Sequence, residues 1–277
     1  VQQPLNGNGE TKSLEQFNRS LHFGQFTPRF SMQYLSSHNQ LFYASVSKGY
    51  KAGGFNVSFL NNDDYLYSPE YNWNYEIGTK LSFLNNRLSA DLSLFYIDWR
   101  NQQITNTIPT VGNVIRNAGR SRNKGIEASF QARPTKSWMM YMNYGYTDAR
   151  FVHYQKEERG ILKDYEGNYL PMVPRHTFSL TTGYSFYDIC SWIDRLTLNA
   201  GVSVTGPIYW YEDNQAKQSP YALVNLRISI NKGCFTWEAW SKNLTNTDYL
   251  SYYFVTSKAY AQKGKPITLG TSVSISL

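Results

Sequence analysis

The chain has 277 residues and a formal net charge of +7, and 16% of its residues are aromatic. Its mean hydropathy is −0.50, and no apolar run approaches the roughly 18 residues of a spanning helix, which excludes helical membrane insertion. The basic residues are scattered rather than clustered, so nucleic-acid binding is not expected, whereas a basic balance suits an anionic ligand or the phosphates of an outer leaflet.

Residues 1–25 are polar and include Asn6-Gly7-Asn8-Gly9, so we expect a loop or a disordered lead-in. The start at Val1 has neither a basic region nor an apolar core. Either a signal peptide has been removed, or the chain is not the natural N-terminal part. From residue 26 onward, apolar and polar residues alternate, which is the period of a strand with one apolar face.

The stretch from Tyr71 to Phe83 shows this alternation most clearly. Its odd positions are Tyr71, Trp73, Tyr75, Ile77, Thr79, Leu81 and Phe83, and its even positions are Asn72, Asn74, Glu76, Gly78, Lys80 and Ser82. One face is therefore apolar and aromatic, and the other is polar and charged. The run is longer than most strands of soluble sheets and is long enough to cross a bilayer as a tilted strand.

Eleven such segments follow one another. We expect strands at 26–34, 40–50, 70–84, 87–99, 126–133, 138–146, 178–186, 196–205, 222–230, 235–239 and 267–277. Short connections (35–39, 85–86, 134–136, 187–194 and 231–233) alternate with long ones (51–69, 101–117, 151–172, 207–220 and 244–265). Short turns on one rim and long loops on the other are typical of outer-membrane barrels. The alternative is a soluble β-sandwich, whose strands are usually shorter and lack this asymmetry.

Short motifs carry a family resemblance. They are Ser47–Asn56 (SKGYKAGGFN), Tyr75–Lys80 (YEIGTK), Asn117–Gly119 with Gly125–Glu127, Leu170-Pro171 with Pro174–Thr177, Lys242–Asn246 with Tyr249, and Gly264–Pro266. In this order and spacing they resemble the C-terminal barrel half of TonB-dependent outer-membrane receptors, in the siderophore-receptor branch. The resemblance covers residues 26–277.

The resemblance implies a transmembrane barrel of 22 strands that follows a plug domain and a segment contacting the TonB complex. With eleven strands and no plug, this chain is expected to be an all-β, antiparallel half of that barrel. The implied function is active uptake of a scarce bulky ligand, most simply a ferric siderophore, across the outer membrane of a Gram-negative bacterium. The implied partners are the plug, the remaining strands, the TonB complex and outer-membrane lipid.

Heme, cobalamin and oligosaccharides remain alternative ligands. A surface adhesion module and a passive porin remain alternative functions, since an adhesin needs no plug and a porin needs an even number of strands. No enzyme is expected: the four histidines (His22, His38, His153 and His176) are far apart in sequence, and no metal or cofactor motif is present. Cys190 and Cys234 fall at expected periplasmic turns, where a disulfide is permitted, but two unpaired thiols are the simpler expectation.

Two sets of residues are candidates for function. The aromatic residues of the long loops are candidates for a ligand vestibule: Tyr65, Tyr67, Tyr209, Trp210, Tyr211, Tyr252, Tyr253 and Phe254. An interfacial aromatic girdle with loop packing is the alternative for these residues. Polar inward positions are candidates to hold the plug or line the path, or simply to form a wet lumen: Arg29, Glu76, Lys80, Asp91, Glu127, Arg133, Arg227 and Glu238. The parity of His176 with Phe178 points His176 outward.

Overall fold

The computed structural model describes residues 20–37, 40–59, 62–108, 111–117, 119–158, 161–255 and 258–276. Within these ranges one antiparallel sheet has eleven strands in chain order, which confirms the predicted strand number and the all-β class. The strands are β1 (Arg29–Leu35), β2 (Leu41–Lys51), β5 (Glu70–Phe83), β6 (Leu88–Arg100), β9 (Arg120–Ala132), β10 (Trp138–His153), β13 (His176–Cys190), β14 (Ile193–Thr205), β17 (Tyr221–Lys232), β18 (Phe235–Lys242) and β21 (Thr268–Ile275). Among the described residues, no helix has the length and apolar character needed to span a membrane.

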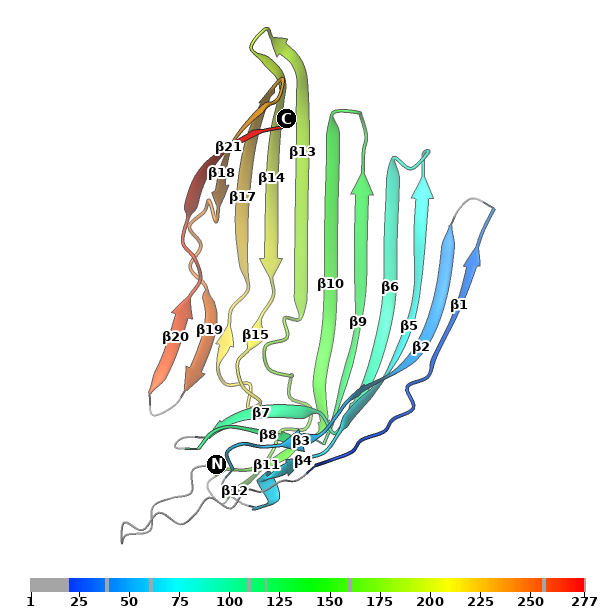
Figure 1. The fold of residues 1–277 in the computed structure, drawn as a ribbon, viewed down its shortest axis with the longest axis vertical. Helices are drawn as coiled ribbons and strands as arrows, with labels where there is room; N and C mark the ends of the chain where they lie inside the picture. Colours follow the sequence, from blue (N-terminus) through cyan, green and yellow to red (C-terminus); the bar gives the residue numbers. More distant parts are fainter. Residues whose placement is uncertain are drawn as a thin grey trace.

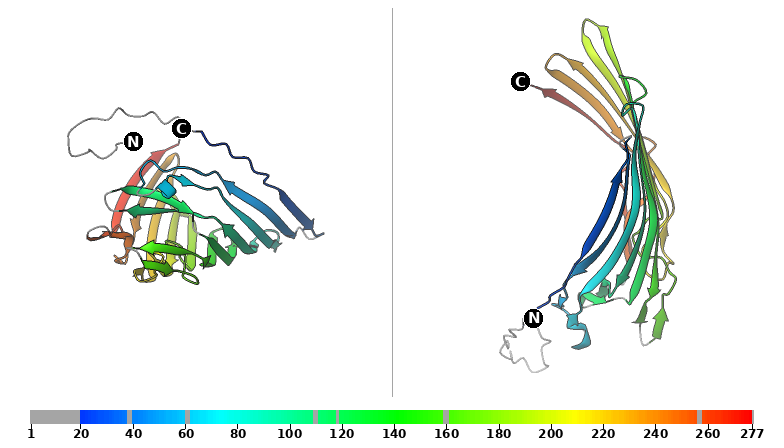
Figure 2. Two further views of the ribbon diagram at one scale, coloured as in Figure 1. Left: turned by 90° about the horizontal axis from the view of Figure 1, so that it is seen from below. Right: turned by 90° about the vertical axis from the view of Figure 1, so that its right-hand side faces the viewer.

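The sheet is open and strongly curved (Figures 1 and 2). β1 and β21 each pair with one neighbour, and every residue of β1 is exposed. A long strand with an unpaired edge is a site for pairing with further strands. The architecture is therefore that of half a barrel, with two edges available to the strands that would complete it.

The two rims of the sheet differ. At the short-turn rim, which lies at the top of Figure 1, consecutive strands are joined by brief turns. At the long-loop rim, each connection forms a small hairpin of its own. These hairpins pair β3 (Gly54–Phe55) with β4 (Leu66–Tyr67), β7 (Gln103–Ile108) with β8 (Gly112–Asn117), β11 (Gln155–Glu158) with β12 (Ile161–Asp164), β15 (Ile208–Tyr209) with β16 (Lys217–Gln218), and β19 (Leu250–Val255) with β20 (Ala259–Lys263). A short 3-10 helix, η1 (Asn62–Asp64), precedes β4.

The prediction of plain loops at the long-loop rim was therefore wrong. The hairpin strands have only two to six residues, which is too short to show a clear period of two. Several long strands also extend beyond their predicted ends: β9 begins at Arg120 rather than at residue 126, β10 continues to His153, and β13 continues to Cys190. At the added ends of β9 and β10 charged residues continue the strand, whereas apolar positions mark the predicted strands. β1 begins at Arg29 rather than at residue 26.

The strand register separates a polar face from an apolar face. One row of paired residues crosses six strands as Lys80, Asp91, Ser129, Asn143, Ser179 and Ser203. Its members bond to one another, because Ser129 Oγ donates to Asn143 Oδ1 (2.9 Å) and Asn143 Nδ2 donates to Ser179 Oγ (3.2 Å). The next row, on the opposite face, is Thr79, Leu92, Ala128, Tyr144, Phe178 and Val204. The predicted amphipathic wall is thus observed.

The buried apolar cluster lies at the long-loop rim, on the parity of the polar face. Ala149 and Phe151 of β10 are 2% and 1% exposed, and they pack with Tyr154, Tyr165 and Leu170. Ile104 of β7 packs against this cluster, so the β7–β8 hairpin from the previous connection covers the same face. The second long loop therefore folds across the polar side of the wall near its rim, where the left view of Figure 2 shows the β7–β8 hairpin within the arc of strands.

Candidate ligand-capture site in the long loops

The first two long loops are joined into one body by buried polar contacts. Asn56 is 5% exposed. Its Nδ2 donates to the carbonyls of Asp64 (2.7 Å) and Ile115 (2.8 Å), and its Oδ1 accepts from the Ile115 amide (2.8 Å). The Asp64 carboxylate also accepts two bonds from Arg116 at 2.6 Å each. A two-point pair of this kind fixes orientation as well as distance, so η1 and β8 are held together.

The third and fourth long loops are joined by a reciprocal pair of bonds. Asn214 Oδ1 accepts from the Tyr169 amide (2.7 Å), and Asn214 Nδ2 donates to the Tyr169 carbonyl (2.9 Å). The ring of Tyr169 stacks on Tyr209 with centroids 5.4 Å apart and planes 7° apart. The Arg150 and Arg175 guanidiniums lie over the Tyr169 ring at 4.0 and 4.8 Å. Tyr209 of the fourth loop, Arg150 of β10 and Arg175 just before β13 thus enclose the Tyr169 ring.

The predicted aromatic residues of the fourth and fifth long loops come together in space. Trp210 meets Tyr252 edge-on at 6.3 Å, and Tyr211 meets Tyr253 edge-on at 6.2 Å. The Val255 amide donates to Tyr211 Oη at 2.6 Å, which ties the β19–β20 hairpin to the fourth loop. Burial raises the pKa of the Tyr211 hydroxyl above its ordinary value, so this hydroxyl is neutral throughout the physiological range.

An exposed aromatic strip continues from this contact. Tyr252 lies 5.8 Å from Phe254, and Phe254 stacks on Tyr260 at 5.0 Å with planes 13° apart. These three side chains are 42%, 39% and 47% exposed, whereas Trp210 behind them is 6% exposed. Sequence reasoning missed Tyr260, and the density of aromatic residues in the expected loop 244–265 was the available signal. We call Tyr252, Phe254 and Tyr260 the aromatic strip.

Tyr65 and Tyr67 lie in the first long loop and pack within it. Tyr65 lies 5.2 Å from both Phe55 and Phe59. Tyr67 lies against Gly54, where a Cβ would come within 2.5 Å of its hydroxyl. The predicted set is therefore divided: the structure brings together the residues of the fourth and fifth loops and gives these two tyrosines a separate packing role.

The predicted polar positions share the polar face of the wall. Glu76 Oε1 accepts from Tyr43 Oη at 2.7 Å, and Lys80 lies opposite Asp91 in the register. Glu238 Oε1 accepts from Ser229 Oγ at 2.7 Å and lies 3.8 Å from Arg227 Nη1. Arg29 and Glu127 lie in strands on the same face, with Ser47 and Ser93 as register partners. Arg133 follows β9 directly, and its amide donates to the Arg87 carbonyl. Whether these side chains contact a plug stays a prediction.

Several motif residues have clear structural roles. Gly78 faces Tyr43, so that a Cβ there would come within 2.5 Å of the ring that bonds Glu76. A Cβ at Gly264 would come within 2.0 Å of Tyr249, which stacks on Tyr221 at 4.4 Å. Asn243 has a φ of 49° and bonds Thr247 and Lys265. These motifs specify the wall and its loop junctions rather than a ligand site.

His176, Cys190 and Cys234 do not form a common site. His176 faces the apolar side beside Tyr146, and its Nδ1 lies 3.0 Å from Tyr144 Oη. Cys190 and Cys234 are exposed and form no disulfide. No group of three or more His, Cys, Asp or Glu residues within the described ranges is placed to hold a metal ion.

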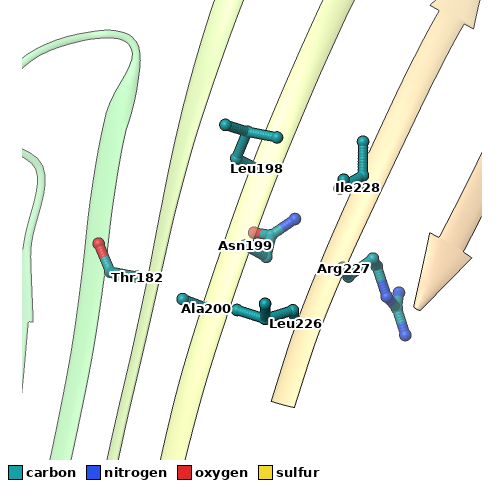
Figure 3. A pocket seen from close by; sticks show the side chains of 7 residues that line it. All are labelled: Thr182, Leu198, Asn199, Ala200, Leu226, Arg227 and Ile228. Atoms are coloured by element: carbon teal, nitrogen blue, oxygen red, sulfur yellow. The ribbon is translucent and has the colours of Figure 1, made fainter. Parts of the chain in front are cut away.

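A shallow hollow of about 410 Å³ lies on the wall between β13, β14 and β17 (Figure 3). Leu198, Leu226 and Ile228 line it on the apolar face, and Asn199 and Arg227, which have the opposite parity, also border it. Residues of both faces thus contribute to this shallow depression, and it contains no group that assigns it a ligand.

The chain matches the family described as "TonB dependent receptor-like, beta-barrel" over residues 3–246. It is 26% identical to the probable TonB-dependent siderophore receptor PiuA of Acinetobacter baumannii, over 81% of this chain and 30% of the relative. It is also 26% identical to the pesticin receptor of Yersinia pestis, over 91% of this chain and 36% of the relative.

Among solved structures, the ferric yersiniabactin uptake receptor FyuA of Yersinia pestis superposes with a TM-score of 0.75. That likeness has 23% identity and covers 89% of this chain and 36% of FyuA. The chain thus spans about a third of the length of the relatives that it matches.

Proposed function

This chain belongs to the TonB-dependent receptor-like β-barrel family, and on that premise we propose that the full-length protein takes up a ferric siderophore across the outer membrane. Members of this family reside in the outer membrane of Gram-negative bacteria. Relatives named as siderophore receptors support the choice of ligand. In this location the short turns face the periplasm and the long loops face the outside.

The observation that carries the proposal is the aromatic strip on interlocked outer loops. A ferric siderophore is a bulky polar chelate, and its catecholate types present aromatic rings. Aromatic side chains contact such a surface at low cost in conformational entropy. Because Tyr252 packs on buried Trp210, Phe254 and Tyr260 continue the stack from it, and Tyr211 holds the Val255 amide, binding would order few additional side chains.

The polar face supplies the second part of the proposal. A row of polar residues crosses six strands below the loops, from Lys80 to Ser203. Serine, asparagine and charged groups keep such a wall hydrated, which suits the passage of a polar chelate. In this proposal Glu76, Asp91, Glu127 and Arg227 face a plug domain, which gates the path with energy delivered by the TonB complex.

The test is binding of a ligand panel to the full-length receptor in detergent. The panel contains catecholate, hydroxamate and mixed ferric siderophores, with hemin, cyanocobalamin and a maltooligosaccharide, and binding is measured by titration calorimetry. The double variant Y252A/F254A is expected to weaken siderophore binding by about 30-fold, at ~1 kcal/mol for each interfacial aromatic. Trp192→Ala is the matched control, because Trp192 is 82% exposed at the short-turn rim.

The outcomes separate the alternatives. Binding of one ferric siderophore class that is lost in the double variant and kept in W192A supports the proposal. Binding of hemin, cobalamin or oligosaccharide alone would replace the ligand while keeping the receptor. Binding of none of the panel, with the variants indistinguishable from the parent, would return the adhesion or porin function to consideration.

A further inference from the structure

The apolar face of the wall becomes basic just before it reaches the long-loop rim. On β9 the residues that follow Ile126 toward this rim on the same face are Lys124, Arg122 and Arg120. The register aligns Arg122 with Asp98 of β6 on one side and with Arg150 of β10 on the other. Three adjacent strands thus place charged side chains side by side on the face that, lower down, contacts lipid.

The length of the apolar band below these charges fixes their level in the membrane. On β10 the outward residues are Trp138, Met140, Met142, Tyr144 and Tyr146, and Asp148 and Arg150 follow. The nine residues from 138 to 146 match the 9–11 residues of a tilted strand that crosses the hydrocarbon. The next two outward positions therefore lie at the level of the outer-leaflet headgroups.

Aromatic residues mark the same boundary on the neighbouring strands. Tyr75 lies 6.5 Å from Trp73 and 6.1 Å from Tyr96, and Tyr96 is paired with Lys124 in the register. Tyrosine and tryptophan are enriched where the hydrocarbon meets the headgroups. The basic residues lie beside and above this aromatic level.

The cluster carries more cations than its carboxylates neutralise. Asp98 pairs with Arg100 (3.1 Å) and Arg120 (2.6 Å), and Asp148 pairs with Arg150 (2.8 Å) and weakly with Lys124 (4.0 Å). No acidic partner for Arg122 occurs among the residues that the structure describes. The five cations and two carboxylates leave a surplus of three positive charges: Arg100, Arg120, Arg122, Lys124 and Arg150 against Asp98 and Asp148.

We propose that this cluster, which we call the outer basic patch, binds the phosphate groups of an outer-leaflet lipid. Arginine presents paired N–H donors that match phosphate oxygens. Arg122 and Lys124 are exposed and lie on the membrane side of the wall, so a headgroup reaches them while its acyl chains lie along Ile126, Leu94 and Tyr146. The patch lies on the outer face of the wall, opposite the polar face along which the transported ligand is proposed to pass. Its role is therefore independent of that ligand.

The test is lipid binding by the full-length receptor, delipidated in detergent and followed by native mass spectrometry. The probes are bis-phosphorylated hexa-acyl lipid A, the same lipid without its phosphates, and inorganic phosphate. We expect R122Q to weaken lipid A binding about fivefold and R122S/K124S about 30-fold, from the contribution of each basic residue near a charged membrane surface. K136S removes a lysine from the opposite end of the same β9–β10 pair and should change nothing.

Heat-modifiable mobility on gels establishes that each variant is folded. If R122S/K124S does not fold, the single variant R122Q provides the test. The proposal stands if binding falls in the order given, while R122K/K124R binds as the parent does. It is overturned if the double variant binds lipid A normally, or if the phosphate-free lipid binds equally well. Competition by inorganic phosphate at equimolar concentration would assign the patch to free phosphate and would also overturn it.

Discussion

Asn56→Ala should release the first two long loops from each other. Asn56 makes three hydrogen bonds, to the carbonyls of Asp64 and Ile115 and from the Ile115 amide, and it is 5% exposed. Alanine removes all three bonds, and two of them join Asn56 to Ile115 in the second loop. At about 1 kcal/mol per bond the coupling between the loops weakens by ~2 kcal/mol, because the groups left behind are shielded from water. This corresponds to a roughly 30-fold larger population of the opened loops.

Hydrogen exchange of the full-length receptor measures this opening. Peptides covering 54–59 and 111–117 should exchange faster in the variant, while peptides from β10 and β13 should keep the parent's rates. Asp63→Ala is the matched control, because Asp63 is an exposed neighbour of Asp64 in the same short helix. Unchanged exchange at 111–117, or an equal increase in D63A, would refute the conclusion that Asn56 couples these loops.

Three further predictions follow from single contacts. Gly264→Ala should cost about 1–3 kcal/mol of stability and lower the temperature of heat modification, because its Cβ would overlap Tyr249, whereas Gly24→Ala, with nothing within 4 Å, should have no effect. Gly78→Val should likewise destabilise the barrel by about 1–3 kcal/mol by displacing the Tyr43 ring. Adding Tyr43→Phe to this variant should recover none of that stability, because phenylalanine keeps the ring that the new side chain would overlap. Burial raises the pKa of Tyr211, so its contribution to docking of the β19–β20 hairpin is complete below the unfolded value of about 10 and is lost as pH rises through the folded value; the exchange protection factor at 250–255, which corrects for the base-catalysed rise of intrinsic exchange with pH, should fall over that range in the parent and not in Y211F.

The wall of the barrel could be predicted from the sequence because lipid on one side and water on the other impose alternation. In β5 the odd positions from Tyr71 to Phe83 and the even positions from Asn72 to Ser82 lie on the two faces that parity assigns. Eleven strands and their order follow from repeating that reading. The strand ends were missed where parity continued in charged residues, as at Lys124 and Arg122 of β9.

The loop structure could not be predicted in the same way. Strands of two residues, such as β3 and β15, contain no period. The contacts that hold the loops together join residues far apart in sequence, such as Asn56 with Ile115 and Tyr169 with Asn214. Aromatic composition did single out residues 209–211 and 252–254 as candidates, although only the structure shows Trp210 against Tyr252 and Tyr211 against Tyr253 and separates buried Trp210 from exposed Tyr252.

Parity alone also could not locate the outer basic patch. The sequence assigned charged residues in strands to the wet interior, because that is where most of them lie in a barrel. Arg122 and Lys124 have the parity of Ile126 and lie on the outer face, above the hydrocarbon rather than within it. Position along the strand, as well as parity, decides what a charged residue contacts.

We propose that the full-length protein takes up a ferric chelate actively across the outer membrane. The most direct test is accumulation of radioactive iron from the siderophore identified by binding, in iron-starved cells that express the protein, with and without a protonophore. Active uptake predicts accumulation that stops when the inner membrane is de-energised, and that falls in Y252A/F254A but not in W192A. Accumulation that continues unchanged without the proton gradient would contradict active transport and indicate a passive pore.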